Sequence, residues 1–319
     1  MKSNYEPKPL FIERMKLLLG NDFKNYWEKI QERPLKSIRV NTLKISPEEL
    51  KKKLENKNWK IEQPFKKNPE IIIIKSELQP GELGRSLEHL LGYYYVQEIS
   101  SMMPVLVLNP KPNEIILDLC ASPGSKTTQI AAKMENTGTL IANDYKLGRI
   151  KILSSNLERC GVMNTIITKA RGEALCRKLK EINLDEVDKI LIDTSCSGEG
   201  TIKSSPKTLQ MWNIRGIFSF SKIQKNLLER AIEILKPNGE IVYSTCTHAP
   251  EENEEVIDFI LKKFDNIKIE KIFLPLKTRE GITKWQEKEY LEDVKYSCRI
   301  YPQDNDTDGF FIAKLRKVK

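Results

Sequence analysis

Two cysteines and one aspartate stand where predicted strands end in this chain of 319 residues. Ile241 to Tyr243 is typical of a short strand, and Cys246 follows it closely. Residues 190–200, ILIDTSCSGEG, repeat the pattern with a buried strand, then Asp193, then Cys196 in a loop of small residues. Ligands of an open α/β sheet bind at the carboxyl ends of its strands. We therefore expect both thiols and the carboxylate to face a single pocket.

A thiol in the position of Cys246 suggests covalent chemistry, because a thiolate is a strong nucleophile. Pro250 and the glutamates after it predict the first turn of a helix. A helix N-terminus favours thiolate over thiol, although the glutamates oppose this effect. The alternative is a structural role, since free cysteine is among the most buried residue types. The second copy of the pattern, at Cys196, favours the chemical interpretation.

The chain carries a moderate excess of positive charge. Lysine and arginine number 53 against 44 aspartates and glutamates, which gives a net charge of +9. Residues 1–110 hold 19 basic and 14 acidic side chains, so more than half of the excess lies in the first third of the chain. Such an excess is compatible with a polyanionic partner without requiring one. We expect the N-terminal part to form the docking surface for such a partner.

The six cysteines include no CxxC pair, which is typical of a cytosolic protein with free thiols. Three of them are expected to be structural: Cys160, Cys176 and Cys298. His89 and His248 are too few for a histidine-rich metal site, and we expect no metal and a structural role for His248. DNDTDG at 304–309 resembles the start of a calcium loop, but its twelfth position is Leu315, so we predict a turn. Apolar runs such as residues 71–74 are far too short to cross a membrane.

Residues 1–108 are predicted to form an N-terminal domain, helical at first and then α/β. Apolar residues at helical spacing in 10–32 predict two short helices. The sequence Ser46-Pro47-Glu48-Glu49 predicts a capping box that opens a further helix. Strands are predicted at 39–43, 59–62 and 71–74. Together these elements predict one small α/β unit.

Several side chains of this domain have the chemistry to meet RNA. Lysines 51–53 either face solvent or contact phosphates. Arg39 and Asn41, on a predicted strand, have polar groups that reach phosphate or base edges in single-stranded RNA. The three tyrosines of residues 92–101, GYYYVQEISS, are expected in the core, with the lining of a substrate cleft as the alternative.

Residues 109–319 alternate strands with helices, which predicts a Rossmann-like, mostly parallel sheet covered on both faces. The strands are predicted at 115–119, 139–142, 165–168, 189–192, 241–244 and 267–273, followed by an antiparallel strand at 309–315.

The loop after the first of these strands, ASPGSK at 121–126, predicts a ligand without a pyrophosphate group. It lacks GxGxxG, and Ser125 separates the glycine from Lys126, so it is no P-loop. Asp144 ends the second strand, where an acid holds ribose hydroxyls in a Rossmann-like sheet. A tight loop with a ribose clamp fits a nucleoside cofactor such as S-adenosylmethionine.

Two thiols, a carboxylate and a methyl donor suit the methylation of cytosine at carbon 5. That carbon is a poor nucleophile until a thiolate adds to carbon 6. A carboxylate can hold the ring nitrogen and the exocyclic amine, and a second group must help remove the proton of carbon 5. Cys246, Cys196 and Asp193 supply these groups, although the residues alone do not rank the two thiols.

Five segments, in this order, resemble the RNA (cytosine-5)-methyltransferase family of the Sun type: LDLCASPGSKT, ANDYKLGR, IDTSCSGEGT, IVYSTCTHAPEENEEVI and TDGFFIAKL. RVNTL and GYYYVQEISSM resemble the N-terminal signatures of that family. The resemblance covers nearly the whole chain. It implies a seven-stranded methyltransferase fold at 109–319 behind a small RNA-recognition-like domain.

The resemblance also implies roles for individual residues. Cys246 would be the nucleophile, Cys196 would assist release, and Asp193 and Lys126 would lie at the target base. The residues that would bind S-adenosylmethionine are Cys120, Ala121, Ser122, Pro123, Gly124, Ser125, Lys126, Asp144, Arg149 and Asp193. The chain departs from the family pattern at Thr194-Ser195, Lys169 and Gln303. Lys169 stands where an acid often contacts the adenine, so that contact is not assigned.

We therefore expect a cytoplasmic, monomeric, S-adenosylmethionine-dependent enzyme that methylates carbon 5 of cytosine in RNA. The expected substrate is tRNA, from the compact size and the absence of a large appended domain, and rRNA is the alternative. Two further alternatives remain: a methyltransferase for a protein or DNA acceptor, and a non-catalytic RNA-binding protein, which would not need both thiols.

Overall fold

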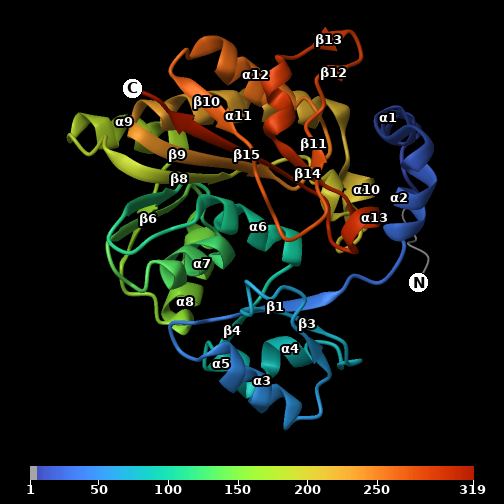
Figure 1. Cartoon of the computed structure of the whole chain (residues 1–319), viewed down its shortest axis with the longest axis vertical. Coiled ribbons are helices and arrows are strands. Elements are labelled where there is room, and N and C mark those ends of the chain that lie inside the picture. The colour runs from blue at the N-terminus through green and yellow to red at the C-terminus, as the bar shows by residue number, and fades with distance from the viewer. Residues whose placement is uncertain (1–5) are drawn as a thin grey trace.

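Residues 6–319 of the computed structural model contain a large sheet, a small sheet and a two-stranded hairpin (Figure 1). The small sheet consists of β1 (Lys36–Val40), β2 (Ile61–Glu62), β3 (Ile71–Ile74) and β4 (Tyr94–Val96). The large sheet consists of β5 (Ile115–Asp118), β6 (Thr139–Asp144), β7 (Thr165–Lys169), β8 (Val187–Asp193), β9 (Leu235–Thr245), β10 (Ile267–Glu270), β11 (Arg279–Glu280), β14 (Cys298–Ile300) and β15 (Phe310–Lys317). The hairpin pairs β12 (Lys284–Trp285) with β13 (Lys288–Glu289).

The α-helices connect and cover these sheets. They are α1 (Pro9–Leu19), α2 (Phe23–Lys29), α3 (Pro47–Glu55), α4 (Glu82–Arg85), α5 (Leu87–Leu90), α6 (Ile99–Leu108), α7 (Ser125–Lys133), α8 (Leu147–Cys160), α9 (Gly172–Glu181), α10 (Lys207–Met211), α11 (Ile214–Glu233), α12 (Glu254–Lys263) and α13 (Pro302–Asn305). Short 3₁₀ turns lie at η1 (Gly20–Asp22), η2 (Glu199–Thr201) and η3 (Glu292–Tyr296).

The strands β7, β6, β5, β8 and β9 are neighbours in this order and run parallel. β15 pairs antiparallel with β9, as the sequence predicts. The other edge of β15 pairs antiparallel with both β14 and β10, and β11 pairs with β14. The Rossmann-like sheet is therefore confirmed, and the short strands β11 and β14 extend it beyond the seven strands that were expected.

Successive residues of the central strands feed two cores, because side chains alternate between the faces of a sheet. Ile190 and Ile192 of β8 belong to a core with residues of α9, α11 and α12. Leu191 of β8 and Val242 of β9 belong to a core with residues of α6 and α7. Helices thus cover both faces of the sheet, and the carboxyl ends of its parallel strands stay accessible at one edge.

The small sheet has the antiparallel order β2-β3-β1-β4, and α3 packs on it. The predicted capping box is present: the Ser46 hydroxyl accepts from the Glu49 amide at 3.2 Å, and the Glu49 carboxylate accepts from the Ser46 amide at 3.2 Å. Lysines 51–53 are exposed. Tyr94 and Tyr95 are buried, which confirms a core position for these two.

The first two helices are separate from the small sheet in space. α1 and α2 lie beside α10 and α13, against the large domain (Figure 1). The apolar residues in their shared core are Phe11, Met15, Tyr26, Ile30, Ile202, Leu209, Trp212, Ile217 and Ala249. The small α/β unit that we expected from the N-terminal third therefore lacks these helices. The predicted boundary at residue 108 stays a prediction, and α6 packs across it on β8, β9 and β15.

The interpretation of Arg39 and Asn41 as RNA contacts is wrong, because both side chains are buried inside the chain. The Arg39 guanidinium donates to the Ser125 carbonyl at 2.6 Å and to the Thr128 hydroxyl at 2.8 Å. The Asn41 amide donates to the Cys160 carbonyl at 2.7 Å. These two residues join the small sheet to the ends of α7 and α8.

Candidate active site

The two cysteines at the strand ends meet in the structure. Asp193, the last residue of β8, pairs in register with Ser244 near the end of β9. The loops that continue from these neighbouring parallel strands bring the Cys196 and Cys246 sulfur atoms to 3.3 Å. The thiols and Asp193 face one cavity, as the strand ends predict.

This cavity has a volume of about 320 Å³, within the usual range for a small-molecule site. Its lining comes from the ends of five strands and the loops after them: Leu119, Cys120, Ser122, Asn143, Asp144, Tyr145, Arg149, Ala170, Gly172, Asp193, Thr194, Ser195, Cys196 and Cys246. It therefore spans from the predicted ribose clamp at Asp144 to the two thiols.

Lys126 is a buried cation at the end of this site. Its ammonium group lies 2.7 Å from the Asp193 carboxylate and donates to the Ser101 hydroxyl at 2.8 Å. It also lies 5.2 Å from the centre of the Phe310 ring. Asp193 accepts a second hydrogen bond, from the Ser244 hydroxyl at 2.8 Å. The carboxylate is thus held in one orientation beside the thiols.

Several titratable groups in and beside the site have shifted pKa values. The hydrogen bond to Cys246, together with burial, raises the pKa of the Cys196 thiol well above its usual value. Burial raises the pKa of Asp118, at the end of β5, to about 7, against the opposing hydrogen bond from the Thr127 hydroxyl. Cys196 therefore keeps its proton at neutral pH.

The loop after β5 contributes to the cavity through only some of its residues. Cys120 and Ser122 line the cavity, whereas Ala121, Pro123, Gly124, Ser125 and Lys126 do not. Gly124 has φ of +105°, a backbone conformation that favours glycine, and it begins α7. The Pro123 carbonyl accepts from the Asn156 amide at 2.9 Å. These residues shape the turn, and their role as cofactor ligands stays a prediction.

A nucleoside cofactor fits the residues at the other end of the cavity. The Asp144 carboxylate is buried and accepts from the Lys146 amide at 3.1 Å and from the Arg149 guanidinium at 2.8 Å. Arg149 also donates to the Ser122 carbonyl at 2.6 Å, and its side chain is half exposed. One lone pair on each Asp144 oxygen stays free for a ligand hydroxyl, which is the arrangement that a ribose clamp needs.

Sequence reasoning missed some lining residues. Tyr145 lines the cavity, is 51% exposed and follows Asp144 directly. An aromatic residue directly after the acid at the strand end was the sequence pattern that could have predicted this. Ala170 and Gly172 also line the cavity. They follow Lys169, to which the sequence analysis assigned no contact. Small residues there leave room for a planar group, and Lys169 is not among the described residues that line the cavity.

The helix expected directly after Cys246 begins later than predicted. Residues 250–253 form turns and α12 starts at Glu254. The Asn253 side chain accepts from the Thr245 hydroxyl at 2.6 Å and donates to the Thr247 carbonyl at 2.9 Å, which folds this segment back over the end of β9. The N-cap residue of α12 therefore contacts the residues on both sides of Cys246, although the helix itself starts four residues later than predicted.

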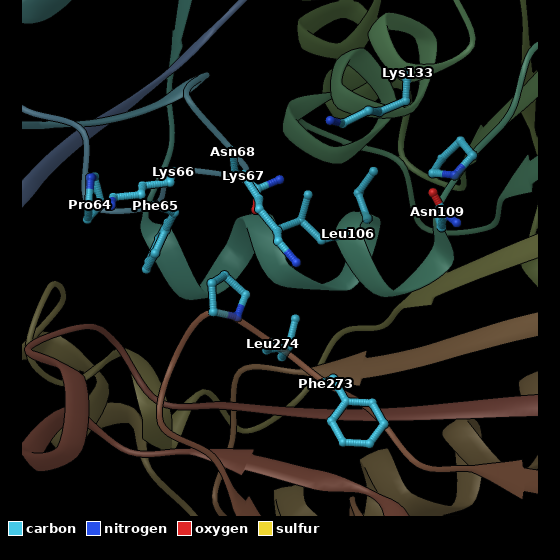
Figure 2. Close-up of a pocket in the computed structure, with 13 residues that line it drawn as sticks. Pro64, Phe65, Lys66, Lys67, Asn68, Leu106, Asn109, Lys133, Phe273 and Leu274 are labelled. Atoms are coloured by element: carbon cyan, nitrogen blue, oxygen red, sulfur yellow. The ribbon is translucent and has the colours of Figure 1, made fainter.

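A larger hollow, of about 670 Å³, lies between the small domain, α6 and the segment after β10 (Figure 2). Its lining within the described residues consists of Pro64, Phe65, Lys66, Lys67, Asn68, Val105, Leu106, Asn109, Pro110, Lys133, Phe273, Leu274 and Pro275. It brings together lysines and apolar side chains without a thiol or carboxylate. The smaller cavity is therefore the candidate active site.

Two further expectations concern metals and membranes. Among residues 6–319, no group of three or more histidine, cysteine, aspartate or glutamate side chains is arranged to hold a metal ion. The aspartates of the calcium-like segment pair within the protein instead, Asp304 with Arg279 and Asp306 with Lys203. In the described part of the chain, no helix is both long and apolar enough to span a membrane.

The sheet is Rossmann-like, and the acid that ends its second strand lines the cavity at the strand ends. These features define an S-adenosylmethionine-dependent methyltransferase. Comparison with known proteins makes the assignment more specific. The family described as "16S rRNA methyltransferase RsmB/F" matches residues 105–316, and "N-terminal domain of 16S rRNA methyltransferase RsmF" matches residues 8–99. The chain belongs to the Sun-type family of RNA (cytosine-5)-methyltransferases, as its motifs predict.

Individual relatives agree with this assignment. The tRNA (cytosine(49)-C(5))-methyltransferase of Pyrococcus abyssi is 43% identical over 308 residues, which is 97% of this chain and 96% of that protein. The ribosomal RNA small subunit methyltransferase F of Aliivibrio salmonicida is 41% identical over 90% of this chain, but over only 59% of its own length.

Solved structures show the same architecture. A methyltransferase homologue from Pyrococcus horikoshii has a TM-score of 0.85 and 35% identity, covering 98% of this chain and 95% of that one. NSun6 from the same organism, solved with the S-adenosylmethionine analogue SFG, has a TM-score of 0.84 and 26% identity over 98% of both chains.

Proposed function

We propose that this enzyme methylates carbon 5 of cytosine in tRNA through a covalent bond between Cys246 and carbon 6. The observation that carries the proposal is the distance of 3.3 Å between the Cys196 and Cys246 sulfur atoms beside the Asp193–Lys126 ion pair. These groups supply a nucleophile, a second thiol and a fixed carboxylate. A protein that only bound RNA would not need the three together.

The chain's residues perform distinct steps. Cys246 gives its thiol proton to solvent, and its sulfur bonds to carbon 6 as the double bond between carbons 5 and 6 opens. The electron pair of that double bond makes carbon 5 nucleophilic, while Asp193 holds the polar edge of the base. When bound, S-adenosylmethionine supplies an electrophilic methyl group and leaves as a neutral thioether. A base then takes the proton of carbon 5, and that electron pair re-forms the ring double bond as the Cys246 sulfur leaves carbon 6.

The contact between the two thiols is compatible with the proposed roles. At neutral pH Cys196 keeps its proton, because its pKa is raised by the hydrogen bond to Cys246 and by burial. A protonated Cys196 can donate its S–H to the Cys246 sulfur, which lies 3.3 Å away. After Cys196 has given its own proton to solvent, its thiolate can take the proton of carbon 5 during release.

The choice of tRNA follows from the relatives. The tRNA methyltransferase of Pyrococcus abyssi matches this chain over nearly the full length of both proteins. The rRNA methyltransferase of Aliivibrio salmonicida has about two fifths of its length outside the match. Methylation of 16S rRNA is the second candidate, because the matching family descriptions and several relatives carry that name.

The test uses wild type, Cys246→Ala and Cys196→Ala, each incubated with labelled S-adenosylmethionine and either unmodified tRNA or 16S rRNA. We expect 5-methylcytidine in digested tRNA from wild type only. We also expect a protein–RNA adduct that survives a denaturing gel with Cys196→Ala, and none with Cys246→Ala.

Each other outcome corrects a specific part of the proposal. An adduct with Cys246→Ala instead of Cys196→Ala would exchange the roles of the thiols. Product in 16S rRNA but not in tRNA would select the second candidate. Labelled RNA without 5-methylcytidine would refute the chemistry.

A further inference from the structure

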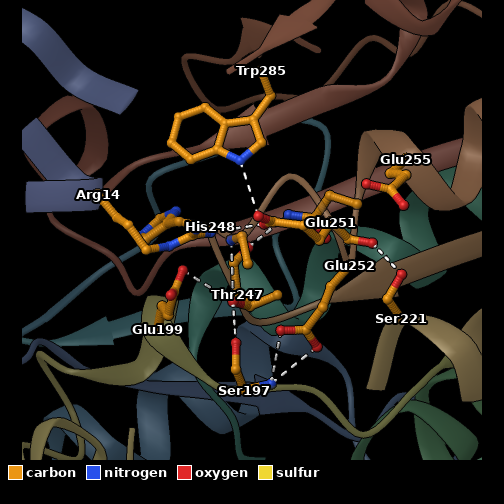
Figure 3. Close-up of polar contacts among 12 residues, drawn as sticks. Arg14, Ser197, Glu199, Ser221, Thr247, His248, Glu251, Glu252, Glu255 and Trp285 are labelled. Atoms are coloured by element: carbon orange, nitrogen blue, oxygen red, sulfur yellow. Dashed lines mark hydrogen bonds and ion pairs between the residues drawn. The ribbon is translucent and has the colours of Figure 1, made fainter. Parts of the chain in front are cut away.

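The backbone on both sides of Cys196 is held by buried side chains from distant parts of the chain. Gln224 of α11 donates from its amide to the Ser195 carbonyl at 3.0 Å. The Ser197 amide donates to the Glu252 carboxyl group at 3.1 Å (Figure 3). The carbonyl before Cys196 and the amide after it are therefore both fixed.

The two holding residues also contact each other. The Gln224 amide donates to the Glu252 carboxyl group at 2.9 Å, and both side chains are 0% exposed. Burial raises the pKa of Glu252 to about 8, against the opposing hydrogen bonds from Ser197 and Gln224. At neutral pH Glu252 is therefore largely an uncharged acceptor, so its role depends on hydrogen bonds rather than on charge.

A further contact ties this loop to the other cysteine. The Ser197 and Thr247 hydroxyls lie 2.7 Å apart (Figure 3). The Gly200 amide donates to the Cys246 carbonyl at 2.9 Å. A Cβ atom at Gly200 would lie 2.2 Å from the Gly309 carbonyl oxygen, so only glycine allows this approach. The position of the Cys196 sulfur relative to Cys246 thus depends on how the loop is held.

We propose that Glu252 and Gln224 are positioning residues that hold Cys196 in place for the release step. This inference rests on the proposed function, in which Cys196 assists release and Cys246 forms the adduct. Loss of either holding residue should let the Cys196 loop move while Cys246 stays at the end of β9. Adduct formation should then continue, and its resolution should slow.

Glu251 provides a matched control beside Glu252. It is also buried, but its carboxylate pairs with Arg14 at 2.7 Å and accepts from the Trp285 indole at 3.0 Å (Figure 3). None of these contacts involves the Cys196 loop. A general loss of stability in this region would affect Glu251 and Glu252 variants alike, whereas a positioning role belongs to Glu252.

The experiment compares wild type with Glu252→Ala, Glu252→Gln, Gln224→Met and Glu251→Gln, using the RNA that the wild type methylates. The readouts are the rate of adduct formation and the rate of its resolution to 5-methylcytidine, measured in a single turnover. Glu252→Ala and Gln224→Met should slow resolution about tenfold, the effect of one or two lost hydrogen bonds, and should accumulate adduct. Glu252→Gln, which keeps the acceptor, should restore resolution to within about twofold, and Glu251→Gln should not accumulate adduct.

Equal adduct levels in Glu252→Ala, Gln224→Met and wild type would overturn the inference, as would accumulation with Glu251→Gln. Circular dichroism checks the fold of each variant, and Gln224→Asn, which shortens the side chain by one methylene, is scored if Gln224→Met is unfolded. Cys196→Ala separates the two proposals. If it accumulates no adduct, the proposed function fails, whereas accumulation with Cys196→Ala but not with the positioning variants refutes only the present inference.

Discussion

At the scale of single residues, Asp144 is the side chain on which cofactor binding should depend most. Its buried carboxylate ends β6 and is oriented by the Lys146 amide and the Arg149 guanidinium. Asp144→Asn replaces one acceptor oxygen with a donor, so a ribose hydroxyl would lose a charge-assisted hydrogen bond. Such a bond is worth roughly 1.5–3 kcal/mol, which predicts S-adenosylhomocysteine binding about 10- to 100-fold weaker by titration calorimetry.

Asp265→Asn is the control for this prediction, because Asp265 is exposed and lies outside the cavity lining. The Asp265→Asn variant should bind S-adenosylhomocysteine with the same affinity as wild type. Unchanged affinity in Asp144→Asn would mean that the cofactor does not use this carboxylate.

The sequence predicted some site residues and not others for a physical reason. Cys196, Cys246 and Asp193 follow strands, and the ends of neighbouring parallel strands meet, so local patterns were enough to bring them together. Gln224 lies on α11, and only the packing of that helix brings its amide to the Cys196 loop. Arg39 was misassigned because a polar residue on a strand gives no local sign of whether it faces RNA or the neighbouring domain.

At the scale of elements, one side chain links β1 to the start of α7. Arg39 is 2% exposed and donates to Ser125, Thr128 and Gln97, so it joins the small sheet to the helix that carries Lys126. Arg39→Met keeps much of the volume and removes the hydrogen bonds that Arg39 donates to these three residues. We expect the free energy of unfolding to fall by roughly 2–4 kcal/mol in urea denaturation.

Lys52→Met is the control for the Arg39 variant, because Lys52 is exposed on α3. It should change the free energy of unfolding by less than about 0.5 kcal/mol. If both variants unfold at the same urea concentration as wild type, the junction between β1 and α7 does not depend on Arg39.

The elements themselves were predictable where their patterns were long. The central strands are mostly apolar runs, so each was predicted near its observed position. Strands of two or three residues, such as β11 and β14, have no period to detect. β14 pairs with the edge of β15, and β11 pairs in turn with β14. The separation of α1 and α2 from the small sheet likewise depends on tertiary packing that no local pattern contains.

At the scale of the whole molecule, several carboxyl groups are buried with raised pKa values. Burial raises the pKa of Asp118 to about 7 and that of Glu252 to about 8. Burial and the neighbouring Asp308 also raise the pKa of Glu98. In the unfolded chain these groups titrate near pH 4, so around neutral pH the folded protein binds protons that the unfolded chain has already released.

The sign of the resulting pH dependence follows from linkage. A group with a raised folded pKa contributes stability that is complete below its unfolded pKa and is lost as pH rises through the folded pKa. Burial lowers the pKa of His248 to about 3 and also lowers that of His89, so the histidines act in the opposite direction. The histidines stop affecting the pH dependence of stability above the unfolded histidine pKa of about 6.5. Between pH 7 and 8 the buried carboxyl groups therefore determine how the free energy of unfolding changes with pH.

We therefore expect the free energy of unfolding to decrease from pH 7 to pH 8, by up to roughly 1.4 kcal/mol per pH unit for each proton released. Urea denaturation at pH 7.0, 7.5 and 8.0 measures this slope. Glu252→Gln should make the slope shallower, because the side chain at that position no longer titrates. Glu287→Gln, which changes an exposed side chain, should leave it unchanged. A wild-type stability that is constant or increases over this range would show that the buried carboxyl groups are already ionised at neutral pH, and the Cys196 loop would then be held by a charged Glu252.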